Sequence, residues 1–173
     1  AILYTNKQID IAIQDQSCNR MNFLLGRYER TAGEFYQEYV DNNQLFKGEP
    51  IKLMSKLTEN LLHGIDYEMV KKRRTENFTY LHQKFSAINK LSLSVPSGPF
   101  MYPLYLTNGA KLRGKLQEKK IFIPTLWPNV CNLCSEIELE YDMAKNILPI
   151  PVDQRYGIDE MKYIVSMVEN ILN

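Results

Sequence analysis

Residues 148–161 constrain the fold of this chain more than any other part of its sequence. They read as a short apolar strand, a turn, and the start of a helix that runs to the C-terminus. Pro149 and Pro151 each lack a backbone N–H, so this strand can form a full hydrogen-bond ladder on one side only. The sequence therefore predicts an edge strand, or a strand with one side left open.

The C-terminal helix has one continuous apolar face. Asp159 is placed to act as its N-cap, with Ile158 and Tyr163 as a hydrophobic staple. The apolar side chains then recur at helical spacing; they are Met161, Ile164, Val165, Val168, Ile171 and Leu172. Because this spacing puts them on one side of a helix, the helix must lie on another element.

The first half of the chain predicts helices. A long amphipathic helix is expected over 17–43, and a second helix begins near Pro50 and ends at Gly64. A third begins after Asp66 as its N-cap. Residues 2–5 look like a strand, and a lone strand has to join a sheet, so we expect the chain to be a piece of a larger protein.

The second half predicts a small sheet. Expected strands cover 91–95, 100–106, 121–124 and 148–151, with helices over 108–120 and 135–146 and an irregular loop over 125–132. The predicted class is α+β: an N-terminal helical segment followed by a small, mostly antiparallel sheet with helices on one face. The predicted domains are a strand remnant and helical segment, 1–64, and an α+β small domain, 65–173.

Composition excludes several classes of partner. The formal net charge of +1 provides no field for a nucleic acid or an anionic membrane. No apolar run approaches the roughly 20 residues of a membrane span. Three cysteines, an odd number, do not make a disulfide framework. We therefore expect a cytoplasmic protein with neither nucleic acid nor membrane as a partner.

Few residues carry recognisable chemistry. Cys131 and Cys134 have the spacing of a zinc or redox pair, but zinc needs four ligands and no second pair lies nearby, which favours packing thiols. The basic run 71–74 reads as a solvated helix face, except that Arg74 falls in the apolar stripe and should pair with a carboxylate or with carbonyls. Asn77, one turn later, should hydrogen-bond to backbone across a helix–strand contact. Trp127 either lines a ligand surface or packs at an edge.

Taken in order, several segments resemble the DegT/DnrJ/EryC1/StrS family of aminotransferases. They are the helix at 65–81, the strand at 99–106 with the helix after it, the Leu-Trp-Pro loop at 126–128 and the closing stretch 148–161. Residues 2–6 resemble the strand that follows the cofactor lysine in that family. The family uses pyridoxal phosphate, has fold type I and acts mostly on nucleotide-linked keto sugars. The resemblance identifies this chain as its C-terminal small-domain portion, with the turn at 153–156 as a structural element.

The same resemblance implies where function lies. The Schiff-base lysine and the carboxylate that pairs with the pyridine nitrogen belong to a large N-terminal domain that nothing here matches, so this chain alone should neither bind pyridoxal phosphate nor transaminate. Asn19 and Arg20 resemble the family's Asn-x-Arg element, which reaches the cofactor phosphate from the partner subunit, although here the two residues are adjacent. Trp127 is expected on the substrate side, and the intact protein is expected to be a homodimer.

Two other functions stay open. The first is a non-catalytic binding or regulatory module derived from that family. The second is a metal-binding module that uses Cys131 and Cys134. The sequence contains no phosphate-binding loop, nucleophile elbow or His-x-x-x-His pair that would favour another enzyme class.

Overall fold

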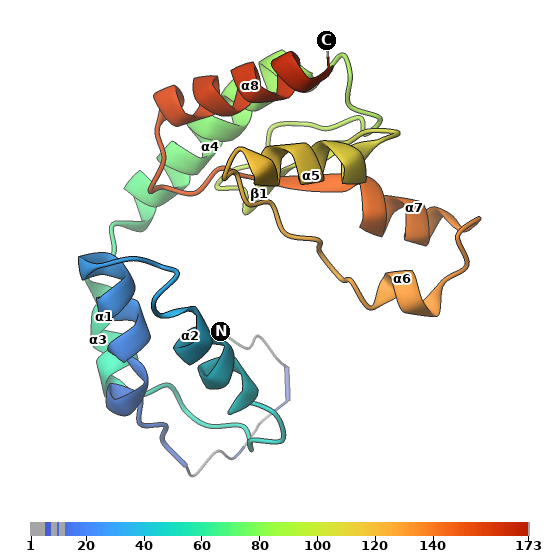
Figure 1. Cartoon of the computed structure of the whole chain (residues 1–173). Helices are drawn as coiled ribbons and strands as arrows, with labels where there is room; N and C mark the ends of the chain where they lie inside the picture. The colour runs from blue at the N-terminus through green and yellow to red at the C-terminus, as the bar shows by residue number, and fades with distance from the viewer. Residues whose placement is uncertain (1–5, 8–9, 11–12, 173) are drawn as a thin grey trace. The chain divides into compact units, whose positions relative to one another are not determined.

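A computed structural model of the chain describes residues 6–7, 10 and 13–172. The chain divides into two compact units, Ala1–Ile65 (unit 1) and Asp66–Asn173 (unit 2). Residues 2–5, predicted as a strand, lie outside the described residues. The described elements are a short 3-10 helix Cys18–Arg20, α1 Asn22–Glu29, α2 Tyr36–Gln44, α3 Lys56–His63, α4 Tyr67–Phe85, β1 Met101–Tyr105, α5 Gly109–Glu118, α6 Val130–Leu133, α7 Leu139–Asn146, β2 Ile147–Pro151 and α8 Ile158–Leu172 (Figure 1).

The predicted α+β class is confirmed. The described part of the chain contains eight α-helices and a two-stranded antiparallel sheet, with the helical segment first and the sheet in unit 2. Within that part no helix is long and apolar enough to cross a membrane.

Three prolines determine how the sheet is paired. In the antiparallel register Pro103 lies opposite Pro149, and Pro151 lies at the same end as the start of β1. The N–H of Tyr105 points away from β2, because it donates to Oδ1 of Asn89 at 3.0 Å. Strand residues two apart share a direction, so the missing N–H of each proline also belongs to an outer edge. The prolines therefore leave the β1–β2 ladder intact and remove donors only from its two outer edges.

The predicted strands at 91–95 and 121–124 are not strands in the structure. At the outer edge of β1 the side chain of Asn89 replaces a neighbouring strand: its amide donates to the Pro103 carbonyl at 2.9 Å and its oxygen accepts from the N–H of Tyr105. At the outer edge of β2, Arg113 donates to the Ile147 carbonyl at 2.7 Å. Side chains satisfy these edges because proline leaves too few donors for a backbone ladder.

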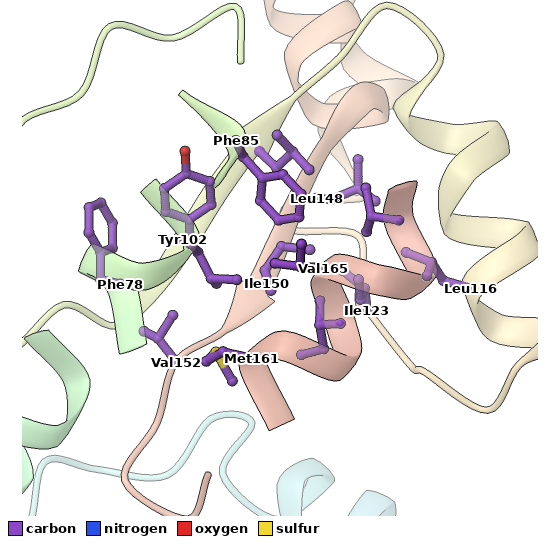
Figure 2. Close-up of a cluster of buried hydrophobic side chains, with 14 of the residues drawn as sticks. Phe78, Phe85, Tyr102, Leu116, Ile123, Leu148, Ile150, Val152, Met161 and Val165 are labelled. Atoms are coloured by element: carbon purple, nitrogen blue, oxygen red, sulfur yellow. The ribbon is translucent and has the colours of Figure 1, made fainter. Parts of the chain in front are cut away.

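One face of the sheet forms the core of unit 2. Tyr102, Leu104, Leu148 and Ile150 are fully buried and alternate along β1 and β2 with less buried residues. They pack against apolar side chains of α4, α5 and α8, and α4 and α8 lie side by side (Figures 1 and 2). The partners from the helices are Phe78, Leu81, Phe85, Leu112, Leu116, Met161, Ile164, Val165 and Val168. The predicted apolar face of the C-terminal helix thus lies on the sheet.

Helix α4 is held to the strand ends by polar side chains. Its predicted N-cap is confirmed, since Asp66 accepts from the N–H of Met69 at 2.9 Å. Asn77 is fully buried and donates to the carbonyls of Val152 at 3.2 Å and Tyr156 at 3.0 Å. The prediction that Asn77 bonds to backbone is confirmed, although its partners lie in the segment just after β2 and not in a strand.

The start of α8 differs from the prediction. The helix begins at Ile158, so Asp159 lies in its first turn and is not the N-cap. The N–H of Gly157 donates instead to the Glu160 carboxylate at 2.7 Å, which satisfies a donor that the helix itself leaves unpaired. The helix at 135–146 is likewise shorter, because α7 begins at Leu139, and the expected loop 125–132 contains the start of α6.

Unit 1 breaks the predicted helix over 17–43 into the 3-10 helix, α1 and α2. The ring of Phe35 occupies the space beside Gly26 that a Cβ would need, so the chain turns back between α1 and α2. The second predicted helix begins at Lys56 and not near Pro50. Leu53 is held extended there, because its N–H donates to the Ile13 carbonyl at 2.9 Å.

Two glycines of α5 give opposite predictions. A Cβ at Gly109 would collide with the backbone carbonyl of Asn146, whereas a Cβ at Gly114 would meet nothing within 4 Å. We expect Gly109→Ala to lower the free energy of unfolding by about 2 kcal/mol or more, because rigid backbone must move. Gly114→Ala should raise it by about 0.5–1 kcal/mol, since alanine favours a helix. Urea unfolding of both variants measures this, and equal effects would contradict the packing of α5 on α7.

Candidate functional site

A cleft of about 430 Å³ lies on the sheet of unit 2. Side chains two residues apart point to the same face of a strand. Met101, Pro149 and Pro151 therefore lie on the face opposite the buried Tyr102 and Ile150. The cleft is lined by Arg74, Phe100, Met101, Phe122, Pro124, Leu126, Pro149, Pro151, Asp153, Gln154 and Arg155.

The wall of the cleft is mostly apolar and contains two exposed aromatic rings. Phe100 is 74% exposed and Phe122 is 70% exposed. Phe122 precedes Ile123, which points into the core and is buried. The segment 121–124, for which the sequence predicts a strand, thus supplies the Phe122 ring to the cleft and the Ile123 side chain to the core. Exposed aromatic rings beside a cleft indicate a contact surface.

Arg74 is the best-positioned charged group in the cleft. Its Nε donates to Oε1 of Gln154 at 3.1 Å, and its Nη1 donates to the carbonyl of Pro99 at 3.1 Å. These bonds tie α4 to the segment before β1 and to the turn after β2. The prediction that Arg74 differs from the rest of the run 71–74 and bonds to carbonyls is confirmed, while its neighbour Arg73 is exposed.

Asp153 and Arg155 form an ion pair in the lining of the cleft. The carboxylate accepts from Nε of Arg155 at 2.7 Å and from Nη2 at 3.0 Å, and also from the N–H of Arg155 at 3.1 Å. These bonds, the side-chain bond first, hold the pKa of Asp153 below its ordinary value. Asp153 therefore stays ionised near neutral pH, and its charge is matched by Arg155.

The lining of the cleft suits binding better than proton transfer. It contains no histidine and no cysteine, and its carboxylate, Asp153, has a lowered pKa and so is a poor proton donor or acceptor near neutral pH. What the cleft offers is a fixed guanidinium beside an apolar, partly aromatic wall. Such a combination orients a ligand.

Trp127 lies next to the cleft without lining it. Its side chain is 66% exposed, it follows the lining residue Leu126, and its backbone is left-handed with φ of 49°. The Trp127 carbonyl accepts from the N–H of Val130 at 3.0 Å, which starts α6. Its expected place on the substrate side stays a prediction.

The two residues predicted to reach a cofactor phosphate belong to unit 1. Asn19 is exposed, and both residues lie in the 3-10 helix. The guanidinium of Arg20 is ion-paired with Asp15 and donates to the Gln16 carbonyl at 2.9 Å, while its plane lies over the ring of Phe46. A phosphate would have to compete with Asp15 for this charge. The described residues of this chain therefore do not by themselves form a phosphate cradle for pyridoxal phosphate, and the assignment stays a prediction.

The thiols do not form a metal centre among the residues that the structure describes. Cys18, Cys131 and Cys134 are free, and no group of three or more histidine, cysteine, aspartate or glutamate side chains is placed to hold a metal ion in that part of the chain. Burial and the nearby Glu138 and Glu140 raise the pKa of the Cys134 thiol.

Comparisons with families of known sequences, with curated proteins and with solved structures found no match for this chain.

Most of the cleft has no signal in the sequence. The turn at 153–156 is predicted to be structural, whereas the structure places Asp153, Gln154 and Arg155 in the lining. Phe122 was missed because alternation within 121–124 predicts a half-buried strand, in which an outward ring is ordinary. The prolines carry one signal, since edges that lack N–H donors predict a sheet that no further strand extends.

The Asp153–Arg155 pair predicts a pH-dependent stability. A carboxyl with a lowered pKa stabilises the folded chain above its unfolded pKa, and this contribution is lost as pH falls through the folded pKa. We expect Asp153→Asn to lower the free energy of unfolding by about 1 kcal/mol at neutral pH, and the difference from the parent chain to disappear in acid. Urea midpoints across acidic pH values measure it.

Asp159→Asn is the matched control. Its partner Lys162 is 2.9 Å away, but the two side chains are 89% and 59% exposed. Exposed pairs contribute little to stability, so at neutral pH this variant should differ from the parent chain much less than Asp153→Asn does. If the difference in unfolding free energy between Asp153→Asn and the parent chain persisted unchanged into acid, the role given to the carboxylate would be contradicted.

Proposed function

We propose that this chain is the C-terminal, small-domain portion of a pyridoxal-phosphate-dependent aminotransferase-like protein of the DegT/DnrJ/EryC1/StrS type. The intact protein would act on nucleotide-linked keto sugars and form a homodimer, in the cytoplasm. The three free cysteines agree with a reducing compartment. The chain by itself does not transaminate.

One observation carries this proposal. The segments that resemble the family come together in unit 2, although they are far apart in the sequence. The helix at 65–81 lies within α4 and its cap, the strand at 99–106 contains β1, and the stretch 148–161 contains β2 and the start of α8. These elements contact one another directly, as β1 with β2, α4 with β1 and α4 with α8. Their joint packing supports reading them as one inherited unit and not as chance matches.

The one-sided sheet is a second support. Helices cover the face with Tyr102 and Ile150, while the opposite face keeps the cleft and the exposed rings of Phe100 and Phe122. A small domain that closes over a substrate held elsewhere needs such an uncovered face. The absence of a histidine or cysteine in the cleft agrees with a chain that shapes a site and leaves proton transfer to another domain.

A coding sequence that is read upstream of residue 1 tests the proposal. We expect it to encode a strand-rich domain with a lysine a few residues before Ile2. The protein expressed from that full reading frame should bind pyridoxal phosphate and show a visible aldimine band, which borohydride abolishes by fixing the cofactor to that lysine. Absorbance spectra and peptide mass spectrometry are the measurements, and replacement of that lysine by alanine is the control.

The 173-residue chain provides the matched comparison. Mixed with pyridoxal phosphate, it should give no such band, because nothing in it resembles the domain that carries the Schiff-base lysine and the pyridinium partner in that family. A reading frame that begins at residue 1 would overturn the aminotransferase proposal and favour the binding module, which the cleft also suits.

A further inference from the structure

The cleft of unit 2 has the volume of a site for a small molecule. Its volume of about 430 Å³ lies within the range of ligand pockets. Its wall combines proline, leucine and phenylalanine side chains with a few polar groups. A ligand for it needs an apolar body that covers most of this wall.

The charges of the cleft do not cancel. Asp153 is paired with Arg155 by two side-chain hydrogen bonds. Arg74 bonds only to neutral acceptors, namely the Gln154 side chain and the carbonyls of Pro99 and Phe100, and has no carboxylate within ion-pair distance among the described residues. The lining therefore carries one more positive than negative charge, and Arg74, which its neighbours already hold in place, bonds to no carboxylate among the described residues.

A fixed, half-buried guanidinium that bonds only to neutral acceptors favours an oxyanion. Arginine binds carboxylate and phosphate groups through charge-assisted hydrogen bonds, which are about twice as strong as neutral ones. The bonds of Arg74 to Gln154 and Pro99 restrict its side chain before any ligand arrives. Binding would then lose little additional side-chain entropy.

The exposed rings of Phe100 and Phe122 indicate which kind of apolar group the ligand carries. Phe100 and Phe122 both line the cleft and are each exposed over more than two thirds of their surface, at 74% and 70%. Aromatic rings recover this exposed area best against another flat apolar group, in a stacked or edge-on contact. The polar groups and the apolar wall of the cleft thus suit two different parts of one ligand.

We propose that this cleft binds a small molecule in which one oxyanion, a carboxylate or a phosphate, is joined to a flat aromatic group. Arg74 holds the oxyanion, and Phe100 and Phe122 contact the aromatic group. The inference uses only residues of unit 2 and does not depend on the proposed aminotransferase origin.

Isothermal titration of the whole chain tests the ligand class. The probes are naphthyl phosphate, naphthoate, the uncharged naphthol, and inorganic phosphate. We expect both charged naphthyl compounds to bind at least about tenfold more tightly than naphthol, since a hydrogen bond to a charged group contributes about 1.5–3 kcal/mol. Inorganic phosphate alone should bind more weakly than naphthyl phosphate. The ratio of the two charged compounds then tells phosphate from carboxylate.

Variants with matched controls locate the site. Arg74→Gln and Phe122→Ala should each weaken naphthyl phosphate binding, by about tenfold or more for the arginine. Arg73→Gln, at the exposed neighbouring arginine, and Leu133→Ala, at a side chain that is 78% exposed and outside the cleft, should bind as the parent does. Thermal unfolding checks each variant, and because Phe122 is exposed its variant should keep the parent's stability even if Arg74→Gln does not.

Three results would overturn the inference. Naphthol that binds as tightly as naphthyl phosphate would show that Arg74 does not select an anion. Equal loss in the cleft variants and in their controls would show that binding is a general surface effect, and unchanged affinity in Phe122→Ala would remove the aromatic contact.

Discussion

Unit 2 depends on the hydrogen bonds that polar side chains of helix α4 donate to backbone carbonyls at the ends of the sheet. A two-stranded sheet is marginal by itself and needs a packed face to be stable. Asn77, fully buried, donates to the carbonyls of Val152 and Tyr156 just after β2, and Arg74 donates to Pro99 just before β1. Buried carbonyls without partners would destabilise the chain by about 1–3 kcal/mol each. These two side chains therefore fix where the sheet begins and ends relative to the helix that covers it.

The same constraint produces the cleft. Once α4 and α8 cover one face, the prolines at 103, 149 and 151 prevent a further backbone ladder on either edge. The segment at 121–124 consequently stays irregular, sends Ile123 into the core and leaves Phe122 outside. Arg74, which stabilises the fold through neutral acceptors, also lines the cleft on this uncovered face, beside the Asp153–Arg155 pair. Its structural role and the binding role proposed for it thus belong to one side chain.

The side chains that line the cleft suit binding and not proton transfer. The cleft has an oriented cation and apolar walls but no group poised to transfer a proton. In unit 1, Arg20 forms an ion pair with Asp15. This division is what a domain that contributes substrate contacts to a larger enzyme would need, and it equally suits a binding module. The proposed origin therefore rests on the joint packing of α4, β1, β2 and α8.

Sequence by itself determined the features that depend on local chemistry. The α+β class, the Asp66 cap, the apolar face of the last helix and the misfit of Arg74 and Asn77 within an apolar stripe all follow from spacing and side-chain type. Sequence did not determine that the helix predicted over 17–43 breaks where Phe35 packs on Gly26, or that α8 begins at Ile158. It also did not determine that the segments 91–95 and 121–124 stay out of the sheet. These outcomes depend on the sheet edges to which Asn89 and Arg113 bond, and on the packing of the Phe35 ring against Gly26. Such contacts join residues distant in sequence, so only the tertiary structure decided them, and with them the cleft.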